Sequence, residues 1–99
     1  MIELYELRQL AAFAEAGTLS EAAEVLHLSQ PALSRNMKKL EEDLGISLFE
    51  RSKNKLELNK NGEYALELAR KLLDDADSFI TRVRDFDRKS RTITLGICA

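Results

Sequence analysis

The sequence predicts a mainly α protein, built as a winged helix-turn-helix followed by a long dimerisation helix. Two short amphipathic segments stand in tandem before residue 45, joined by a tight connection. Two short alternating segments with a basic stretch between them follow at residues 49–58. An apolar residue then recurs every three or four positions from residue 65 to residue 86. These observations divide the chain into a winged helix-turn-helix at 1–59, a linker helix at 60–89, and a hinge with the first strand of a further domain at 90–99.

The first two helices are marked by residues that start and stop helices. The first is expected over Leu4–Ala16 and ends at Gly17, because glycine readily adopts the left-handed conformation that follows a helix. Its buried stripe is expected to consist of Leu7, Leu10, Ala11 and Ala14. The second helix is expected over Ser20–Leu26. It follows Thr18, whose spacing to Glu21 is that of a capping box.

The third helix, expected over Pro31–Leu44, has two different faces. Ser29 is expected to cap it, and Gly45 to end it. The apolar face consists of Leu33, Met37, Leu40 and Leu44. An amide, a hydroxyl and two cations lie beside or opposite that face, on Gln30, Ser34, Arg35 and Lys38. Such a helix suits a nucleic-acid groove, and the second helix of a helix-turn-helix is the one that reads DNA.

The segment after this helix predicts a small wing, with strands around Phe49–Arg51 and Leu56–Leu58 and a basic tip between them. The net charge of the chain is −2, but it is unevenly distributed. Residues 1–28 carry five acids and one base, residues 29–60 carry seven bases and five acids, and residues 61–99 carry seven of each. The third helix and the wing therefore form a local positive patch. We expect phosphate contacts that are modest in strength and sensitive to salt.

The last helix is expected from about Lys60 to Lys89, capped by Asn59. At ~1.5 Å per residue it would be roughly 45 Å long, more than the preceding small domain can cover. Its apolar seam consists of Ala65, Ala69, Leu72, Ala76, Phe79, Val83 and Phe86. This seam is core of some kind, and the length of the helix favours an interface with a second copy over a core within one chain.

The segment Thr92–Ala99 alternates as a strand does, without a partner strand in sight, which suggests part of a longer protein. Cys98 is the only cysteine, so no internal disulfide is possible, and we expect it to be an inert strand residue. His27, in the turn between two helices, is expected to be structural. No membrane span or signal peptide is evident, which predicts a cytoplasmic protein. We expect no catalytic residues, no metal site and no cofactor.

Several motifs in a fixed order resemble one family along the whole chain. They are Ala22-Ala23, the run Leu28-Ser29-Gln30-Pro31-Ala32-Leu33-Ser34, the run Leu40-Glu41-Glu42-Asp43-Leu44-Gly45, and Leu48-Phe49-Glu50-Arg51. Together they resemble the N-terminal DNA-binding domain and linker helix of bacterial LysR-type transcriptional regulators. One departure is Asn59, where the family usually has threonine. Asparagine caps a helix about as well, so the fold is expected to be unchanged.

The resemblance implies a sequence-specific DNA-binding fragment that lacks the effector domain. It implies base-reading roles on the third helix for Gln30, Pro31, Ser34 and Arg35. It implies phosphate contacts for Thr18, Ser29 and Lys38, and wing contacts in the minor groove for Arg51 and Lys53. It further implies a homodimer on an inverted-repeat operator, a tetramer in the full-length protein, and a small-molecule effector bound by the missing domain.

Each of these assignments has a simpler alternative. Arg35 and Lys38 could be solvated surface charges, Gln30 an exposed first-turn residue, and Ser34 a packing residue. Arg51 could be held by Glu50 or Glu57 in a cross-strand pair. The chain as a whole could be a protein-interaction domain with an unused DNA face, which its acidic balance supports.

Overall fold

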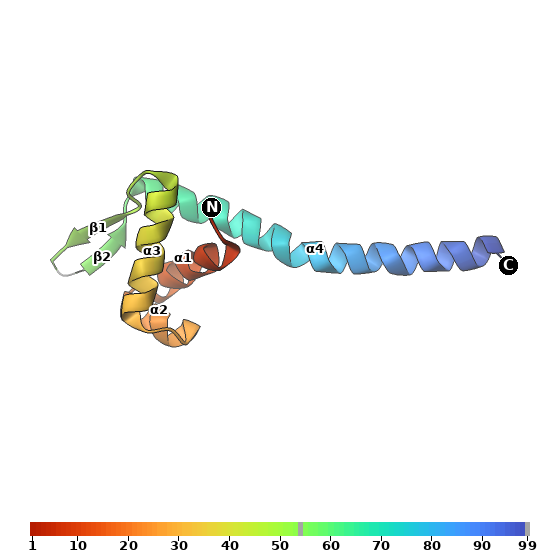
Figure 1. Cartoon of the computed structure of the whole chain (residues 1–99), viewed down its shortest axis with the longest axis horizontal. Coiled ribbons are helices and arrows are strands. Elements are labelled where there is room, and N and C mark those ends of the chain that lie inside the picture. Colours follow the sequence, from red (N-terminus) through yellow and green to blue (C-terminus); the bar gives the residue numbers. More distant parts are fainter. Residues whose placement is uncertain (54, 99) are drawn as a thin grey trace.

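The computed structural model describes residues 1–53 and 55–98, with side chains through Arg91. It is elongated, with extents of 70 × 26 × 20 Å. Figure 1 shows a head built from α1, α2, α3, a two-stranded wing and the first turns of α4, from which the rest of α4 projects alone. The mainly α class predicted from the sequence is confirmed.

The head contains α1 (Leu4–Ala16), α2 (Leu19–Leu26) and α3 (Gln30–Leu44). All three helices end at a residue with a left-handed backbone conformation: Gly17 at φ 87°, His27 at φ 58° and Gly45 at φ 73°. Such a residue turns the chain and lets its N–H bond to the last turn of the helix. The structural role expected for His27 is thereby confirmed, because it forms the turn between α2 and α3.

The core lies where α1, α2 and α3 meet the start of α4. Its buried apolar residues are Leu10, Phe13, Ala22, Ala23, Leu33, Met37, Leu40, Leu48 and Ala69. The apolar stripe predicted for the third helix is confirmed except at Leu44, which is exposed. In the stripe predicted for the first helix, Leu10 is buried, and Leu7 and Ala11 are partly buried. Ala14 is only partly buried, whereas Phe13 is buried and packs edge-on against Phe49 with ring centroids 5.5 Å apart.

The wing consists of β1 (Phe49–Ser52) and β2 (Lys55–Leu58), which pair antiparallel with Phe49 opposite Leu58 and Ser52 opposite Lys55. Both strands are one residue longer than predicted. Lys53 begins the connection between them with φ 48°, a left-handed conformation typical of the tight turns that join hairpin strands.

The last helix, α4, runs from Lys60 to Cys98. The expectation of a strand over Thr92–Ala99 is wrong through Cys98, and Ala99 lies outside the described residues. A strand needs a neighbour for its backbone hydrogen bonds, and no described segment pairs with this one, whereas a helix forms those bonds within itself. The side chain of Cys98 also lies outside the described residues. Among the described helices, none combines the length and apolar composition needed to cross a lipid bilayer.

Candidate nucleic-acid interface

The outer face of α3 presents the polar groups expected to meet DNA. Gln30, Pro31, Arg35 and Lys38 are exposed, and Ser34 is half-buried. The opposite side of the helix is buried in the core through Leu33, Met37 and Leu40. Because that side is packed, the orientation of the helix is set and its outer face is held toward solvent. Among the described residues, Arg35 and Lys38 make no ion pair.

Two further polar residues of α3 face α1. The Asn36 side chain donates a hydrogen bond to Gln9 Oε1 at 2.9 Å. The Lys39 ammonium lies 3.7 Å from Glu6 Oε1, which also accepts the Glu3 N–H at 3.0 Å. Lys38 and Lys39 thus have different tasks, the first open to solvent and the second holding α3 against α1. The sequence did not separate them.

Glu6 is fully buried, with an exposed fraction of 0 %, and its Oε2 has no hydrogen-bond partner among the described residues. A buried carboxylate is stable only with a compensating charge. Here that charge is Lys39, and the Glu6 carboxylate, with a smaller effect of Tyr5, raises the pKa of the Lys39 ammonium. Lys39 thus supplies the positive charge beside the Glu6 carboxylate.

A groove of about 330 Å³ separates α3 from the wing. Its lining residues are Ser34, Met37, Lys38, Glu41, Ser47, Phe49, Arg51 and Leu56. It therefore brings together Ser34 and Lys38 from α3 and Arg51 from β1, three residues predicted separately along the sequence. Arg51 stands opposite Leu56 in the hairpin, and Glu57 pairs with Lys55 at 3.8 Å. Among the described residues, neither Glu50 nor Glu57 forms an ion pair with Arg51.

The other predicted contact residues lie at the ends of elements. The Thr18 hydroxyl accepts the Glu21 N–H at 3.1 Å at the start of α2. The Ser29 hydroxyl accepts the Ala32 N–H at 3.2 Å at the start of α3. Both hydroxyls keep a proton that they can donate outward. Lys53 lies beyond the groove, at the exposed turn of the wing.

The wing is tied to α3 by Glu41, a residue that the sequence did not single out. Its Oε2 accepts the backbone N–H of Leu48 at 2.7 Å and of Phe49 at 3.3 Å, and the Ser47 hydroxyl at 3.1 Å. A single carboxylate oxygen thereby holds the segment that leads into β1. The sequence signals were its place in the family run Leu40–Gly45 and an acid near the C-terminal end of a helix, where the helix dipole disfavours negative charge.

A second tie joins the wing to α4. The Asn59 amide donates to the Ser47 carbonyl at 3.0 Å, and its Oδ1 accepts the Gly62 N–H at 2.8 Å. The expected helix cap at Asn59 is confirmed, and its second hydrogen bond explains why an amide serves here. Gly62 approaches the Leu48 carbonyl so closely that an added Cβ would lie 2.2 Å from that oxygen. The segment 47–49 is therefore held from both sides.

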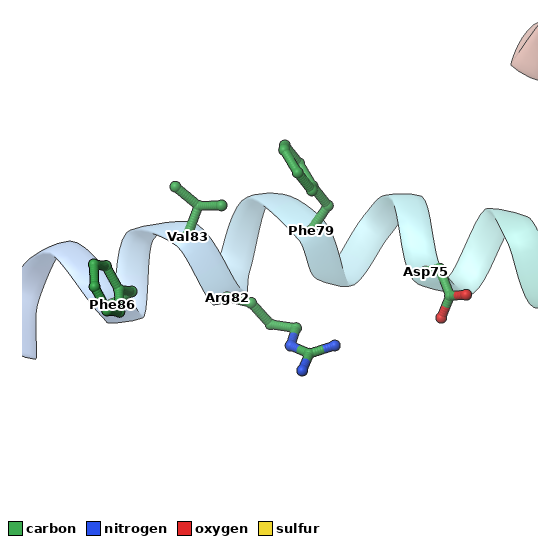
Figure 2. Close-up of a pocket in the computed structure, with 5 residues that line it drawn as sticks. All are labelled: Asp75, Phe79, Arg82, Val83 and Phe86. Atoms are coloured by element: carbon green, nitrogen blue, oxygen red, sulfur yellow. The ribbon is translucent and has the colours of Figure 1, made fainter.

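The apolar seam of α4 changes character along its length. Ala69 is buried in the core of the head, and Ala65 and Ala76 are partly buried. The four larger seam residues are exposed: Leu72 by 53 %, Phe79 by 66 %, Val83 by 52 % and Phe86 by 71 %. Figure 2 shows Phe79 and Val83 projecting from the same side of α4 with no other element against them. The inner end of the seam serves the chain itself, and the outer part has no covering in one chain.

Comparison with known proteins identifies the family. Residues 4–63 match the model of the bacterial regulatory helix-turn-helix proteins of the lysR family. The chain belongs to this family. The matched residues contain the head, the wing and the first turn of α4, so the chain is a DNA-binding domain of the LysR type.

Relatives of this LysR domain are bacterial regulators. It is 36% identical over 96 residues to the uncharacterised HTH-type transcriptional regulator YbhD of Escherichia coli (strain K12), covering 97% of this chain and 30% of that protein. It is 45% identical over 83 residues to the HTH-type transcriptional regulator ClcR of Pseudomonas putida, covering 84% of this chain and 28% of that protein. The chain spans about 30% of the length of these relatives.

Solved structures agree with the LysR assignment. The DNA-binding domain of CbnR, in a complex with DNA, is 43% identical and superimposes with a TM-score of 0.80 over 85% of this chain and 97% of that one. The DNA-binding domain of BenM, in a complex with benA site 1 DNA, is 34% identical with a TM-score of 0.81 over 86% of this chain and 99% of that one. The fold matches LysR domains that were crystallised on DNA.

Proposed function

We propose that this chain binds double-stranded operator DNA in the bacterial cytoplasm, as the DNA-binding part of a LysR-type transcriptional regulator. The observation that carries the proposal is the shared groove, in which Ser34 and Lys38 of α3 meet Arg51 of the wing beside the exposed Arg35. A helix and a wing held at a constant distance can contact one duplex at two points. DNA complexes of the similar CbnR and BenM domains support this.

The proposed contacts follow from the position of each residue. Gln30, Pro31, Ser34 and Arg35 lie on the outward face of α3 and would meet base edges in the major groove, where arginine and glutamine can form bidentate pairs with guanine and adenine. Thr18, Ser29 and Lys38 would contact phosphates. Arg51 and Lys53, on the wing, would reach the adjacent minor groove.

We also propose that residues 1–59 form the DNA-reading unit and residues 60–89 the dimerisation helix. The seam residues Ala65, Ala69, Leu72, Ala76, Phe79, Val83 and Phe86 would then serve the contact between two copies. Two copies would read the two halves of an inverted repeat. For the full-length protein we propose a tetramer and a small-molecule effector, bound by a domain outside this chain. The solved complex of full-length CbnR with its target DNA supports the DNA-reading part of this proposal.

The net charge of −2 makes the second copy important for affinity. A single positive patch on an acidic molecule neutralises few phosphates, so one copy should bind weakly and lose affinity steeply with salt. Two linked copies bind with the advantage of a high effective concentration.

The proposal predicts different results for two neighbouring cations of α3. Replacement Arg35→Ala should weaken binding to the preferred site by about 1–3 kcal/mol and relax base preference, because it removes a base contact. Replacement Lys38→Ala should weaken all sequences alike and reduce the salt slope by about 1, because it removes a phosphate contact. Selection from a random DNA pool, followed by titration at several salt concentrations, measures both effects.

The same selection tests the symmetry of the site. An inverted repeat with constant spacing between its halves is expected from a two-fold dimer. Equal losses on specific and random DNA for Arg35→Ala would contradict its base-reading role. A complete absence of binding, even at low salt, would favour the protein-interaction domain instead.

A further inference from the structure

Two pairs of polar side chains join α1 to α3. The Asn36 amide donates a hydrogen bond to Gln9 Oε1 at 2.9 Å, and the Lys39 ammonium lies 3.7 Å from Glu6 Oε1. Glu6 and Gln9 are buried in α1, with exposed fractions of 0 % and 7 %. Figure 1 shows α3 running across α1, and these two cross-helix pairs lie between the two helices.

The spacing of the cross-helix pairs sets the position of α3 along its own axis. Each helix contributes two residues three positions apart, and their order along α3 is the reverse of that along α1. A slip of α3 by one residue would advance it by ~1.5 Å and turn it by ~100°, so both pairs would break. Two contacts on successive turns therefore resist sliding and rotation together.

The flank of α3 that carries the pairs adjoins Arg35. At ~100° per residue, Asn36 and Lys39 lie between the buried stripe of α3 and Arg35 around the helix. Lys39 follows Arg35 by four residues, so the two side chains are neighbours on the helix surface. A rotation of α3 by ~10° would move an atom ~6 Å from the axis by ~1 Å. A contact that must be placed within about 0.5 Å would be weakened by such a rotation.

Apolar packing constrains this rotation less sharply. The buried stripe of α3 consists of Leu33, Met37 and Leu40. Burial of apolar surface is non-directional, and the unbranched methionine side chain adapts to its surroundings. A hydrogen bond depends on both distance and angle. The cross-helix pairs are therefore the contacts that distinguish one rotation of α3 from the next.

Stability alone does not account for the pair of Glu6 and Lys39. Among the described residues, Glu6 Oε2 has no hydrogen-bond partner. A buried carboxylate with one unmatched oxygen costs free energy, and apolar residues of similar volume often replace a buried ion pair without loss of stability. What the charged pair provides, and an apolar pair would lack, is a preferred direction.

We propose that Glu6, Gln9, Asn36 and Lys39 are positioning residues for base recognition: they set the rotation of α3, and through it the position of Arg35. The base preference of the chain then depends in part on α1, whose two members of the pairs are buried in the head. This inference rests on the proposed DNA-binding function and adds the residues that determine how specific the binding is.

Replacing each pair with apolar residues of similar shape separates positioning from stability. The two variants are Gln9→Met/Asn36→Leu and Glu6→Met/Lys39→Met, and both leave the net charge at −2. The midpoint of urea denaturation should stay within about 0.5 M of the natural value, because both partners are removed together. The ratio of specific to random-DNA affinity should fall about fivefold to tenfold, as expected from a misplaced base contact. Affinity for random DNA should stay within about twofold, because the phosphate contacts remain.

An exchange variant tests whether the hydrogen bond itself matters. Gln9→Asn/Asn36→Gln keeps two amides of the same combined length, so a hydrogen bond can form again. Its ratio of specific to random-DNA affinity should lie within about twofold of the natural ratio. The single variant Asn36→Leu leaves the buried Gln9 amide unpaired. It should therefore unfold at a lower urea concentration than Gln9→Met/Asn36→Leu.

The matched control is Arg8→Met/Asp77→Leu. It removes an ion pair of 3.8 Å that joins α1 to α4 instead of α3, and it also leaves the net charge unchanged. Its base preference within one half-site should equal that of the natural chain. Selection from a random DNA pool measures the base preference, and fluorescence titration at several salt concentrations measures both affinities.

Three outcomes would overturn the inference while leaving the proposed function intact. They are an unchanged affinity ratio in both apolar variants, an exchange variant as unspecific as the apolar ones, and equal losses of affinity for specific and random DNA. An Asn36→Leu variant as stable as the double variant would overturn it too, because the hydrogen bond would then be absent in solution. A natural chain that binds no DNA even at low salt would contradict the proposed function itself, a result visible before any variant is made.

Discussion

At the scale of single residues, Gly62 is required because the Leu48 carbonyl leaves no room for a larger side chain. The residue lies in the first turn of α4, where alanine would be the better helix former by about 1 kcal/mol. An added Cβ would nevertheless lie 2.2 Å from the Leu48 carbonyl oxygen and 2.8 Å from Leu58 Cδ2. The first of these atoms belongs to the backbone and cannot rotate away. The close approach, more than any turn, requires glycine.

We therefore expect Gly62→Ala to lower the free energy of unfolding by about 1–3 kcal/mol, the usual cost of forcing an extra group into a packed site. Urea denaturation followed by circular dichroism measures this change. Asn61→Ala, at the exposed neighbouring position, is the matched control and should change the free energy of unfolding by less than about 0.5 kcal/mol. Equal stability of the two variants would show that the Leu48 segment moves aside without cost.

At the scale of elements, the position of the wing depends on the carboxylate of Glu41. Its Oε2 accepts two backbone N–H groups and one hydroxyl from residues 47–49, the segment that enters β1. Across the same segment, Asn59 binds the Ser47 carbonyl. A two-stranded hairpin is marginal alone, so these ties and the contact of Phe13 with Phe49 hold the wing beside α3.

Removing this tie should loosen the wing before it unfolds the head. For Glu41→Ala we expect a loss of about 1–3 kcal/mol, because the N–H groups of Leu48 and Phe49 lose their acceptor. The substitution should accelerate amide hydrogen exchange at these two residues and in β1 more than it does in α1. Glu41→Gln keeps one oxygen acceptor, so its stability and exchange rates should lie between those of the natural chain and those of Glu41→Ala. Uniform acceleration of exchange over the whole head would contradict a role confined to the wing.

At the scale of the whole molecule, α4 reaches far beyond the head that its first turns complete. Its inner end contributes Ala69 to the core, whereas Leu72, Phe79, Val83 and Phe86 remain exposed. Four large apolar side chains along one helix face form a surface that soluble proteins usually bury against a partner. One chain therefore suffices to fold the head, and we propose that a second copy stabilises the projecting helix.

Leu72→Asp tests this division of roles. The substitution places a charge at the first exposed position of the seam, so light scattering should show a shift from dimer to monomer while the head stays folded. Lys71→Asp, on the outward side of the same turn, is the matched control and should leave the mass unchanged. An unchanged mass for Leu72→Asp would show that the seam is not the interface. DNA affinity should fall together with the loss of the dimer.

Sequence reasoning worked best where local patterns decide structure. The caps at Thr18, Ser29 and Asn59 and the stops at Gly17 and Gly45 were predicted because a helix end depends on a few neighbouring residues. The two strands of the wing were placed within one residue for the same reason. It worked less well for polar residues, since nothing local distinguishes the paired Lys39 from the open Lys38. The long helix was stopped too early because residues 92–98 have the alternation of a strand.

By itself, the sequence determined the class of fold, the family and the order of elements as far as the last helix, since periodicity, capping and family motifs are properties of the chain. The tertiary structure alone decided which groups meet. It brought Arg51 to Ser34 and Lys38 across one groove, used Glu41 and Gly62 to hold the wing, and turned Glu6 inward against Lys39. Those contacts join residues far apart in the chain, and their energies depend on distance and burial, which no local pattern contains.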